Sequence, residues 1–332
     1  MNAPARAGGR RGRRTADVPA LVAGAREGDA RSVARLISLV EDASPLLREV
    51  AAALAPHTGR ARVLGLTGPP GVGKSTTTTA LVRAFRAAGQ RVGVLAVDPS
   101  SPFSGGALLG DRVRMQDHAG DAGVFIRSMA SRGHLGGLAW ATPQALRVLD
   151  AAGCDVVLVE TVGVGQSELE VASLADTTLV LLAPGMGDGI QAAKAGILEV
   201  ADVFVVNKAD RDGADQTVRD LRGMLSLGGR HTDAGAWRPP IVKTVAYRDA
   251  DAGIEEVVAR IGEHAAWLDS SGEGHRRRVA RAAREIEAIA VAGVRERMGD
   301  VGGSAALPAL AERVVAGETD PYRAADHLVA QL

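Results

Sequence analysis

The chain has 332 residues, of which 46% are hydrophobic, and its formal net charge is zero. The length suits one large α/β domain with additions, or two modest domains. A neutral chain is not expected to be a general nucleic-acid-binding protein, because such proteins usually carry a basic excess. No apolar run approaches the roughly 18 residues of a membrane span. The single cysteine, Cys154, excludes an internal disulfide and most cysteine-rich metal sites.

The first 17 residues are rich in arginine, glycine and alanine and contain no acidic residue before Asp17. They lack the apolar stretch of a secretory signal, and their lack of serine disfavours a transit peptide. We therefore expect residues 1–17 to form a disordered tail on a cytoplasmic protein.

Residues 18–56 are predicted to form a helical N-terminal extension. Leucine, valine and isoleucine recur there at spacings of three and four, which is typical of amphipathic helices. Asp29 and the stretch from Asp42 to Ser44 are suited to cap successive helices.

The central part of the chain, residues 57–265, is predicted to be an α/β domain. Short β-branched runs begin at Arg62, and helical stretches separate most of them. The runs are RVLGLT, RVGVLAVD, GVFIRS, DVVLVET, TTLVLLAP, DVFVVNKAD and PIVKTVA. This alternation indicates a mostly parallel sheet covered by helices on both faces. Right-handed crossovers would place the loops that follow the strands at one edge, where such folds bind ligands.

After about residue 253 the strands stop, and residues 266–332 are predicted to be a helical C-terminal region. One apolar stripe surrounded by arginine and glutamate runs along a long helix. Its members are Val279, Ala283, Ile286, Ala290 and Val294. Two shorter helices are expected near 304–316 and 320–331. The stripe suits either a dimer interface or docking onto the chain's own central domain.

The segment GLTGPPGVGKST matches the phosphate-binding pattern G-x-x-x-x-G-K-[ST] and lies between a predicted strand and a predicted helix. Backbone N–H groups of such a loop turn toward the phosphates, and the helix N-terminus adds partial positive charge. Lys74 is expected to reach the β- and γ-phosphates, and Ser75 to bind Mg²⁺. Only four of the 39 basic residues are lysines, and the broad guanidinium of arginine does not suit the position of Lys74. The predicted phosphate-binding residues are Gly68, Gly71, Val72, Gly73, Lys74, Ser75 and Thr76.

The segment NKAD, residues 207–210, follows another strand and resembles the guanine-specificity motif of GTPases. An ionised Asp210 only accepts hydrogen bonds, so it suits the two adjacent donors of guanine, which adenine lacks. The stem of Lys208 can lie over the base, and Asn207 can tie this loop to the phosphate loop. The sequence therefore predicts GTP rather than ATP as the nucleotide.

Glu160 ends the apolar strand DVVLVE, where many GTPases have an aspartate that holds Mg²⁺ directly or through water. Gly163 lies where a backbone N–H would bind the γ-phosphate and lose that bond after hydrolysis. Val164 occupies the place of the catalytic glutamine of small GTPases, and Gln166 lies nearby. We therefore expect slow hydrolysis that a partner accelerates.

Two carboxylates flank a loop rich in glycine and serine within residues 97–115. Asp98 ends a strand beside the phosphate-loop strand, and Asp111 lies beyond the loop. One is expected to help hold the metal, and the other to approach when the γ-phosphate is present. The alternative is a loop in which both aspartates cap turns.

Four segments together resemble the MeaB/ArgK group of P-loop GTPases. These segments are GPPGVGKST, VDPSSPFSGGALLGDRVRM, ETVGVGQSE and NKAD, and the resemblance extends from about residue 18 to the C-terminus. It implies a homodimeric GTPase chaperone of an adenosylcobalamin-dependent acyl-CoA mutase, chiefly methylmalonyl-CoA mutase, with a helical N-terminal extension and a C-terminal dimerisation arm.

The resemblance also implies roles for individual residues. Ser75, Asp98, Asp111 and Glu160 would surround Mg²⁺, and residues 184–194, which end at Lys194, would form a further mobile loop. Lys243 falls where a last base-contacting loop is expected. GTP would be the substrate and GDP the product, with Lys74, Asp98, Asp111, Glu160 and Gly163 serving hydrolysis.

Three other functions remain as alternatives. A GTP-binding interaction protein would show no meaningful turnover. A nickel-insertion GTPase would need a histidine-rich tract or a Cys–His metal pair, whereas this chain has seven scattered histidines and one cysteine. A small-molecule kinase, such as the arginine/ornithine transport kinase that the ArgK name implies, would usually prefer ATP, which NKAD disfavours.

Overall fold

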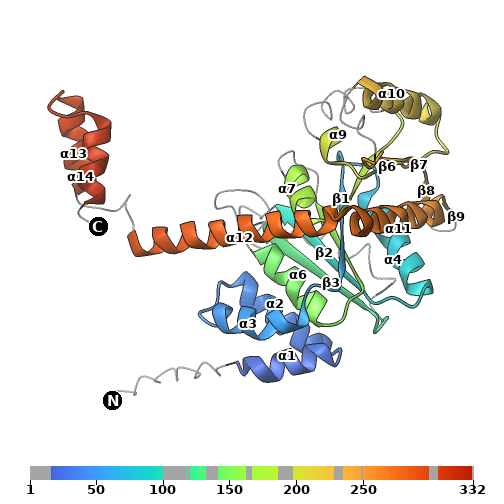
Figure 1. Ribbon diagram of the computed structural model, residues 1–332, viewed down its shortest axis with the longest axis horizontal. Helices are drawn as coiled ribbons and strands as arrows, with labels where there is room; N and C mark the ends of the chain where they lie inside the picture. Colours follow the sequence, from blue (N-terminus) through green and yellow to red (C-terminus); the bar gives the residue numbers. More distant parts are fainter. Residues whose placement is uncertain are drawn as a thin grey trace, which may run out of the picture. The chain divides into compact units, whose positions relative to one another are not determined.

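The computed structural model describes residues 16–99, 118, 120–131, 141–161, 167–185, 197–227, 235–247, 250–298 and 306–330 (Figure 1). The chain divides into two compact units, with the boundary between Ser271 and Gly272. The domain limits predicted from the sequence, at residues 17, 56 and 265, stay predictions.

A seven-stranded parallel sheet forms the centre of the first unit, with the strand order β3-β2-β4-β1-β5-β6-β7 (Figure 1). The seven strands correspond to the seven β-branched runs. They are β1 (Arg62–Thr67), β2 (Val92–Pro99), β3 (Val124–Ser131), β4 (Val156–Thr161), β5 (Thr177–Leu182), β6 (Val203–Val206) and β7 (Ile241–Lys243). A separate antiparallel pair consists of β8 (Val245–Tyr247) and β9 (Ala250–Ala252). The predicted α/β fold with a parallel sheet is confirmed.

Helices cover both faces of this sheet. One face packs on α4 (Lys74–Ala87) and α11 (Ile254–Ser271), with Leu64, Leu158 and Leu179 in the shared core. Valines at alternate strand positions, such as Val157, point to the opposite face, as the two-residue period of a strand requires. That face is covered by α6 (Ala141–Ala151), α7 (Ser167–Leu174), α9 (Ile197–Val200) and α10 (Ala214–Leu227).

The N-terminal extension consists of α1 (Val18–Arg26), α2 (Ala30–Glu41), α3 (Leu47–Leu54) and a short 3₁₀ turn, Ala55–His57. The Asp29 carboxylate accepts hydrogen bonds from the Arg31 and Ser32 N–H groups, so it caps α2 as predicted. Leu36 and Ile37 are fully buried in the same core as α6, which fixes the extension to the sheet domain.

A buried aromatic cluster joins α11 to the amino ends of β5 and β6. His264 is fully buried, and its Nδ1 lies 2.8 Å from the Thr177 hydroxyl. The ring contacts both Trp237 and Trp267, with centroids 4.8 and 5.5 Å away, and the two indoles also contact each other, 5.9 Å apart. The Trp237 indole donates to the Asp202 carbonyl at 2.7 Å, so the loop before β7 is also anchored here.

The second unit contains α12 (Glu273–Met298), α13 (Ala306–Val315) and α14 (Pro321–Val329), in agreement with the three helices expected from the sequence. Leu310, Ala324 and Leu328 form a small core between α13 and α14. On α12, three members of the predicted stripe, Val279, Ile286 and Val294, are 54%, 67% and 55% exposed. This unit therefore presents an apolar helix face that is not covered by described residues.

Within the described ranges, every helix is too short or too polar to cross a membrane.

Candidate functional site

The phosphate loop lies between β1 and α4, where three glycines have positive φ angles: Gly68, Gly71 and Gly73. A Cβ on Gly68 would lie 2.2 Å from the Leu181 carbonyl oxygen, and a Cβ on Gly73 would lie 2.4 Å from the Asn207 amide nitrogen. Only glycine fits these two positions, because both the backbone angle and the space exclude a side chain. The loop therefore packs directly against β5 and the loop after β6.

Lys74 begins α4 and is 7% exposed. Its ammonium group donates to the carbonyls of Gly68 at 2.6 Å and Pro69 at 3.0 Å, so it folds over its own loop. An ammonium at this position, beside a helix N-terminus, forms a positively charged cradle that suits phosphate oxygens.

Glu160 is the next-to-last residue of β4 and lies on the face that packs against α4. Val156 and Leu158 belong to the core on that face, and Glu160 continues the same alternation. The carboxyl group is 2% exposed and accepts from the Ser75 hydroxyl at 2.6 Å and the Thr78 hydroxyl at 2.8 Å. Ser75 and Glu160 thus place two hard oxygen donors side by side at the phosphate loop, the kind that Mg²⁺ binds.

The remaining predicted metal ligands are only partly covered by the structure. Asp98 lies in β2, two residues beyond Ala96, which pairs with Glu160 in the strand register. Asp111, Gly163, Gln166 and Lys194 lie outside the described residues. Within those residues there is no cluster of three or more histidine, cysteine, aspartate or glutamate side chains suited to a metal. The complete ligand set therefore stays a prediction.

Asn207 connects three segments of the site. Its side-chain N–H donates to the Val72 carbonyl at 2.8 Å. Its side-chain oxygen accepts from the Thr244 hydroxyl and from the Ala246 N–H, both at 3.2 Å. The side chain is 2% exposed, so the loop after β6, the phosphate loop and the loop after β7 form one framework around it.

The other polar residues of the NKAD segment lie nearer the surface. Lys208 has a φ of +56° and donates to the Gly71 carbonyl at 2.6 Å, so its stem spans from the NKAD segment to the phosphate loop. Asp210 is exposed, and no described residue hydrogen-bonds or ion-pairs with its carboxylate. That carboxylate is available to accept the two donors of a guanine base.

Lys243, at the end of β7, forms an ion pair with Asp215 of α10, with 3.1 Å between Nζ and Oδ1. This hydrogen bond holds the pKa of the Asp215 carboxyl below its usual value. Both side chains are exposed. In the structure, Lys243 therefore contacts α10, and the predicted contact with guanine stays a prediction.

Sequence reasoning missed three residues that the structure brings into this framework: Thr78, Thr244 and Ala246. Thr78 follows the phosphate motif by one helical turn, so its spacing of four from Lys74 places it on the same face of α4. Thr244 and Ala246 lie in a run that resembles an ordinary strand, and nothing in that run indicates a contact with Asn207.

Comparisons with known proteins agree with this geometry. The family described as methylmalonyl Co-A mutase-associated GTPase MeaB matches residues 33–301. A Pyrococcus abyssi protein whose name places it among GTPases is 48% identical over 310 residues, which is 92% of this chain and 94% of that protein. The mitochondrial methylmalonic aciduria type A homolog of Mus musculus is 36% identical over 276 residues, covering 77% of this chain and 65% of the relative.

A solved structure has the same overall fold. The crystal structure of a LAO/AO transport system kinase superposes with a TM-score of 0.68 at 27% sequence identity, and the match covers 94% of this chain and 96% of that one. The chain therefore belongs to the MeaB family of P-loop GTPases, and it binds GTP and hydrolyses it to GDP and phosphate.

Proposed function

We propose that this GTPase is a chaperone that assists cofactor loading and protection of an adenosylcobalamin-dependent acyl-CoA mutase, such as methylmalonyl-CoA mutase. The observation that carries the proposal is the family match over residues 33–301, because the family is described as associated with that mutase. The mouse relative is named for methylmalonic aciduria, which agrees with the same proposal. The cytoplasmic location expected from the sequence is part of this proposal.

The nucleotide is proposed to bind along the framework around Asn207. Lys74 would release the carbonyls of its own loop and bind the β- and γ-phosphates, while Asp210 would accept from guanine. Both assignments are supported by position: Lys74 lies inside the loop, and Asp210 is exposed and without a partner among the described residues.

Mg²⁺ fits the oxygen donors of Ser75 and Glu160, which lie 2.6 Å apart. When bound, the ion would neutralise charge on the β- and γ-phosphates. The Ser75 hydroxyl would then turn its oxygen to the ion and its proton away from Glu160. The Glu160 carboxylate would hold the ion directly or through water, with Thr78 still donating to its other oxygen.

We propose that GTP turnover depends on a partner, because of the residue that the sequence places beside the γ-phosphate. Val164 stands where small GTPases have the glutamine that orients the attacking water. We propose that contact with the mutase completes the γ-phosphate site.

Homodimerisation is proposed through α12, the C-terminal arm. Val279, Ile286 and Val294 lie at spacings of seven and eight residues and are all exposed. Burying such a stripe against a second copy would remove apolar surface from water.

GTP turnover should be measured for the full chain with Mg²⁺, alone and with a purified adenosylcobalamin-dependent acyl-CoA mutase. We expect the mutase to raise turnover about tenfold or more, because a completed γ-phosphate site contributes at least that much. Lys74→Ala with the same mutase is the control for contaminating hydrolysis. Turnover that is unchanged by the mutase, with binding absent in a pull-down, would contradict the chaperone proposal while leaving the GTPase activity intact.

A further inference from the structure

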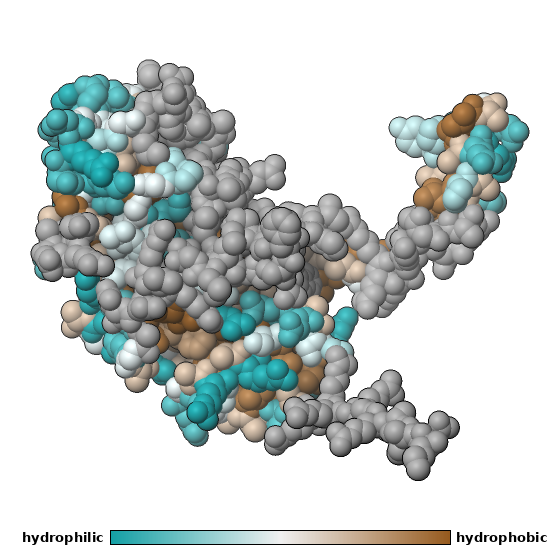
Figure 2. All heavy atoms as spheres, turned by 180° about the vertical axis from the view of Figure 1, so that it is seen from behind, coloured by the Kyte–Doolittle hydropathy of each residue, from teal (hydrophilic) through white to brown (hydrophobic). Residues whose placement is uncertain are grey.

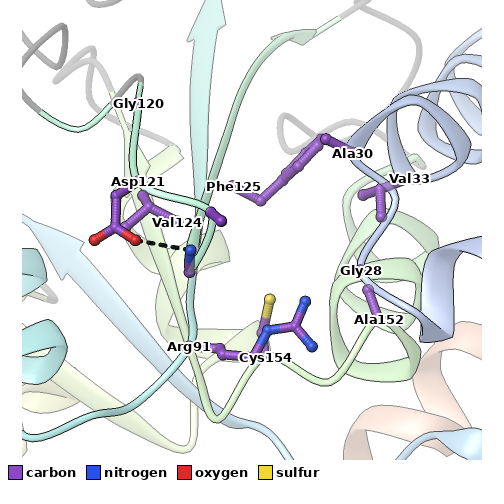
Figure 3. A pocket seen from close by; sticks show the side chains of 12 residues that line it. Gly28, Ala30, Val33, Arg91, Gly120, Asp121, Val124, Phe125, Ala152 and Cys154 are labelled. Atoms are coloured by element: carbon purple, nitrogen blue, oxygen red, sulfur yellow. Dashed lines mark hydrogen bonds between the residues drawn. The ribbon is translucent and has the colours of Figure 1, made fainter.

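A cavity of about 260 Å³ lies at the edge of the sheet opposite the phosphate loop (Figure 3). The segments that precede β2, β3 and β4 form its floor, and the turn between α1 and α2 forms the opposite wall. The nucleotide site follows the carboxyl ends of the strands, whereas this cavity lies at their amino ends. It is therefore separate from the GTPase site. Its lining includes Gly28, Val33, Arg91, Val124, Phe125 and Cys154.

Arg91 enters the cavity from the residue before β2. Its N–H donates to the Asp155 carboxylate at 2.7 Å, and its carbonyl accepts from the Asp155 N–H at 2.8 Å, so the main chain is held on both sides. The guanidinium lies between Gly28 and Gly153. A Cβ on Gly28 would lie 3.1 Å from Nη2, and one on Gly153 would lie 3.0 Å from Nη1. The absence of side chains at these two glycines thus leaves space for the Arg91 guanidinium.

The guanidinium of Arg91 has no hydrogen-bond or ion-pair partner in the part of the chain that the structure describes. Three acids close to the cavity bond to other groups. Asp121 accepts from Arg86 at 2.8 and 3.0 Å. It also accepts from the Gly123 N–H at 2.8 Å, the bond drawn as a dashed line in Figure 3. Asp29 caps α2, and Asp155 holds the main chain of Arg91. A fully charged group with five donors therefore faces the cavity without a direct hydrogen-bond or ion-pair partner among the described residues.

Apart from the Asp121 carboxylate, which is paired with Arg86, the other side chains of the walls are apolar or neutral. Val33 and Cys154 are almost fully buried, and Figure 3 shows the Cys154 sulfur and the Arg91 side chain next to each other. Burial raises the pKa of the Cys154 thiol to about 11, so this group stays neutral and serves as a wall. Phe125 and Val124 extend the apolar surface from β3.

We propose that this cavity is a binding site for a short-chain aliphatic monocarboxylate, whose carboxylate pairs with the Arg91 guanidinium and whose alkyl chain contacts Val33 and Phe125. The guanidinium fork matches a carboxylate in bidentate geometry. Among the described lining residues Arg91 is the one basic side chain, and the one acidic side chain, Asp121, is neutralised by Arg86, so the site offers one positive charge and suits a monoanion. The volume lies near the lower end of small-molecule pockets, which limits the ligand to a few carbons.

The test uses the full chain and measures binding of butyrate by calorimetry, with neutral butyramide and inorganic phosphate as comparison ligands. We expect butyrate to bind more tightly than either. Arg91→Gln should weaken butyrate about tenfold, the loss of one bidentate charge pair. Arg62→Gln is the matched control, because Arg62 is exposed at the same edge of the sheet but does not line the cavity. GTP affinity should be unchanged in both variants.

A second variant tests the site without removing the charge. Ala30 is exposed and lines the cavity at the first turn of α2, so Ala30→Leu should obstruct it and weaken butyrate with Arg91 intact. Butyrate binding that is absent in the unmodified protein, or that survives both Arg91→Gln and Ala30→Leu, would overturn the proposal. Phosphate or butyramide binding as tightly as butyrate would also overturn it, since either charge or alkyl chain would then be irrelevant.

Discussion

The two halves of the nucleotide site are each built around one buried polar side chain, but the two side chains have different kinds of partner. On the base side, Asn207 bonds to the Val72 carbonyl and the Ala246 N–H, with the Thr244 hydroxyl as a third partner. On the metal side, Glu160 accepts from the hydroxyls of Ser75 and Thr78. Among these bonds, those of Asn207 in the base half go mainly to main-chain groups, whereas those of Glu160 in the metal half go to side-chain hydroxyls.

This difference implies different responses to a ligand. Backbone groups of a buried loop cannot rotate away, so the base half is a fixed frame that keeps three loops in register. A hydroxyl can rotate its proton to another acceptor at little cost, so Ser75 can exchange Glu160 for a metal ion. The geometry thus separates a rigid half, which we assign to base recognition, from an adjustable half, which we assign to hydrolysis.

The largest effect on nucleotide affinity is expected from a substitution in the phosphate loop, which lies between the base half and the metal half. Lys74→Ala removes the ammonium that now rests on the Gly68 and Pro69 carbonyls and that we assign to the phosphates. We expect GTP and GDP affinity to fall about a hundredfold or more, because charge-assisted bonds to at least two oxygens are lost. Fluorescent-nucleotide titration measures this. Affinity within threefold of the unmodified protein would refute the assignment of Lys74 to the phosphates.

Asn207→Ala tests whether the base half is a fixed frame. It leaves the buried Val72 carbonyl and Ala246 N–H without this partner, and we expect the free energy of unfolding to fall by about 2–4 kcal/mol. Urea unfolding without nucleotide measures the change. Thr244→Val removes only one of the three bonds and should cost about 1 kcal/mol. Equal losses in the two variants would mean that the main-chain bonds contribute nothing.

Asp210→Asn tests guanine recognition separately from the framework around Asn207, because it changes the base-reading group and leaves the bonds of Asn207 in place. The side chain is exposed and has no partner among the described residues, so stability should stay unchanged. GTP affinity should fall about tenfold or more, because the amide now meets the guanine donors with its own donor. Xanthosine triphosphate, which offers an acceptor there, should bind the variant better than GTP does. If both nucleotides weaken equally, Asp210 does not read the base.

The sequence predicted the strands and the phosphate loop because their signals are local. The run RVLGLT followed by GPPGVGKST specifies a strand, a glycine turn and a helix start in consecutive residues, and the structure has β1, the loop and α4 there. The cap at Asp29 is similarly a short-range feature, and it was also predicted correctly.

Contacts between distant segments were harder to predict. The run PIVKTVA was expected to be one strand, but it divides into β7 and β8, because the chain turns at Thr244 to close around Asn207. The Thr244 N–H bonds to the Val206 carbonyl, and the Thr244 carbonyl accepts from Ala209. Lys243 lies 3.1 Å from Asp215 of α10, a contact that the sequence did not predict. Neither partner is near its contact in sequence, so spacing alone does not reveal either one.

Substitution of Thr78 should give the smallest effect of these predictions and tests the metal half most selectively. Its hydroxyl has one proton and two acceptors in reach, the Lys74 carbonyl at 3.0 Å and the Glu160 carboxylate at 2.8 Å. Because the carboxylate is charged and closer, we infer that Thr78 donates to it and positions Glu160 for Mg²⁺. Thr78→Val should raise the Mg²⁺ concentration needed for half-maximal GTP turnover about threefold to tenfold, the net contribution of one typical hydrogen bond.

Thr79→Val is the matched control for Thr78→Val, because Thr79 is the next residue of the same helix and its hydroxyl bonds only to the Ser75 carbonyl among the described partners. It should leave the Mg²⁺ dependence unchanged, while Thr78→Ser should restore it. If the valine variants shift the Mg²⁺ dependence equally, the effect comes from packing of α4 and not from the bond to Glu160. If only Thr78→Val shifts it, the metal half depends on a hydroxyl outside the phosphate motif, and its adjustable character is explained by replaceable side-chain bonds.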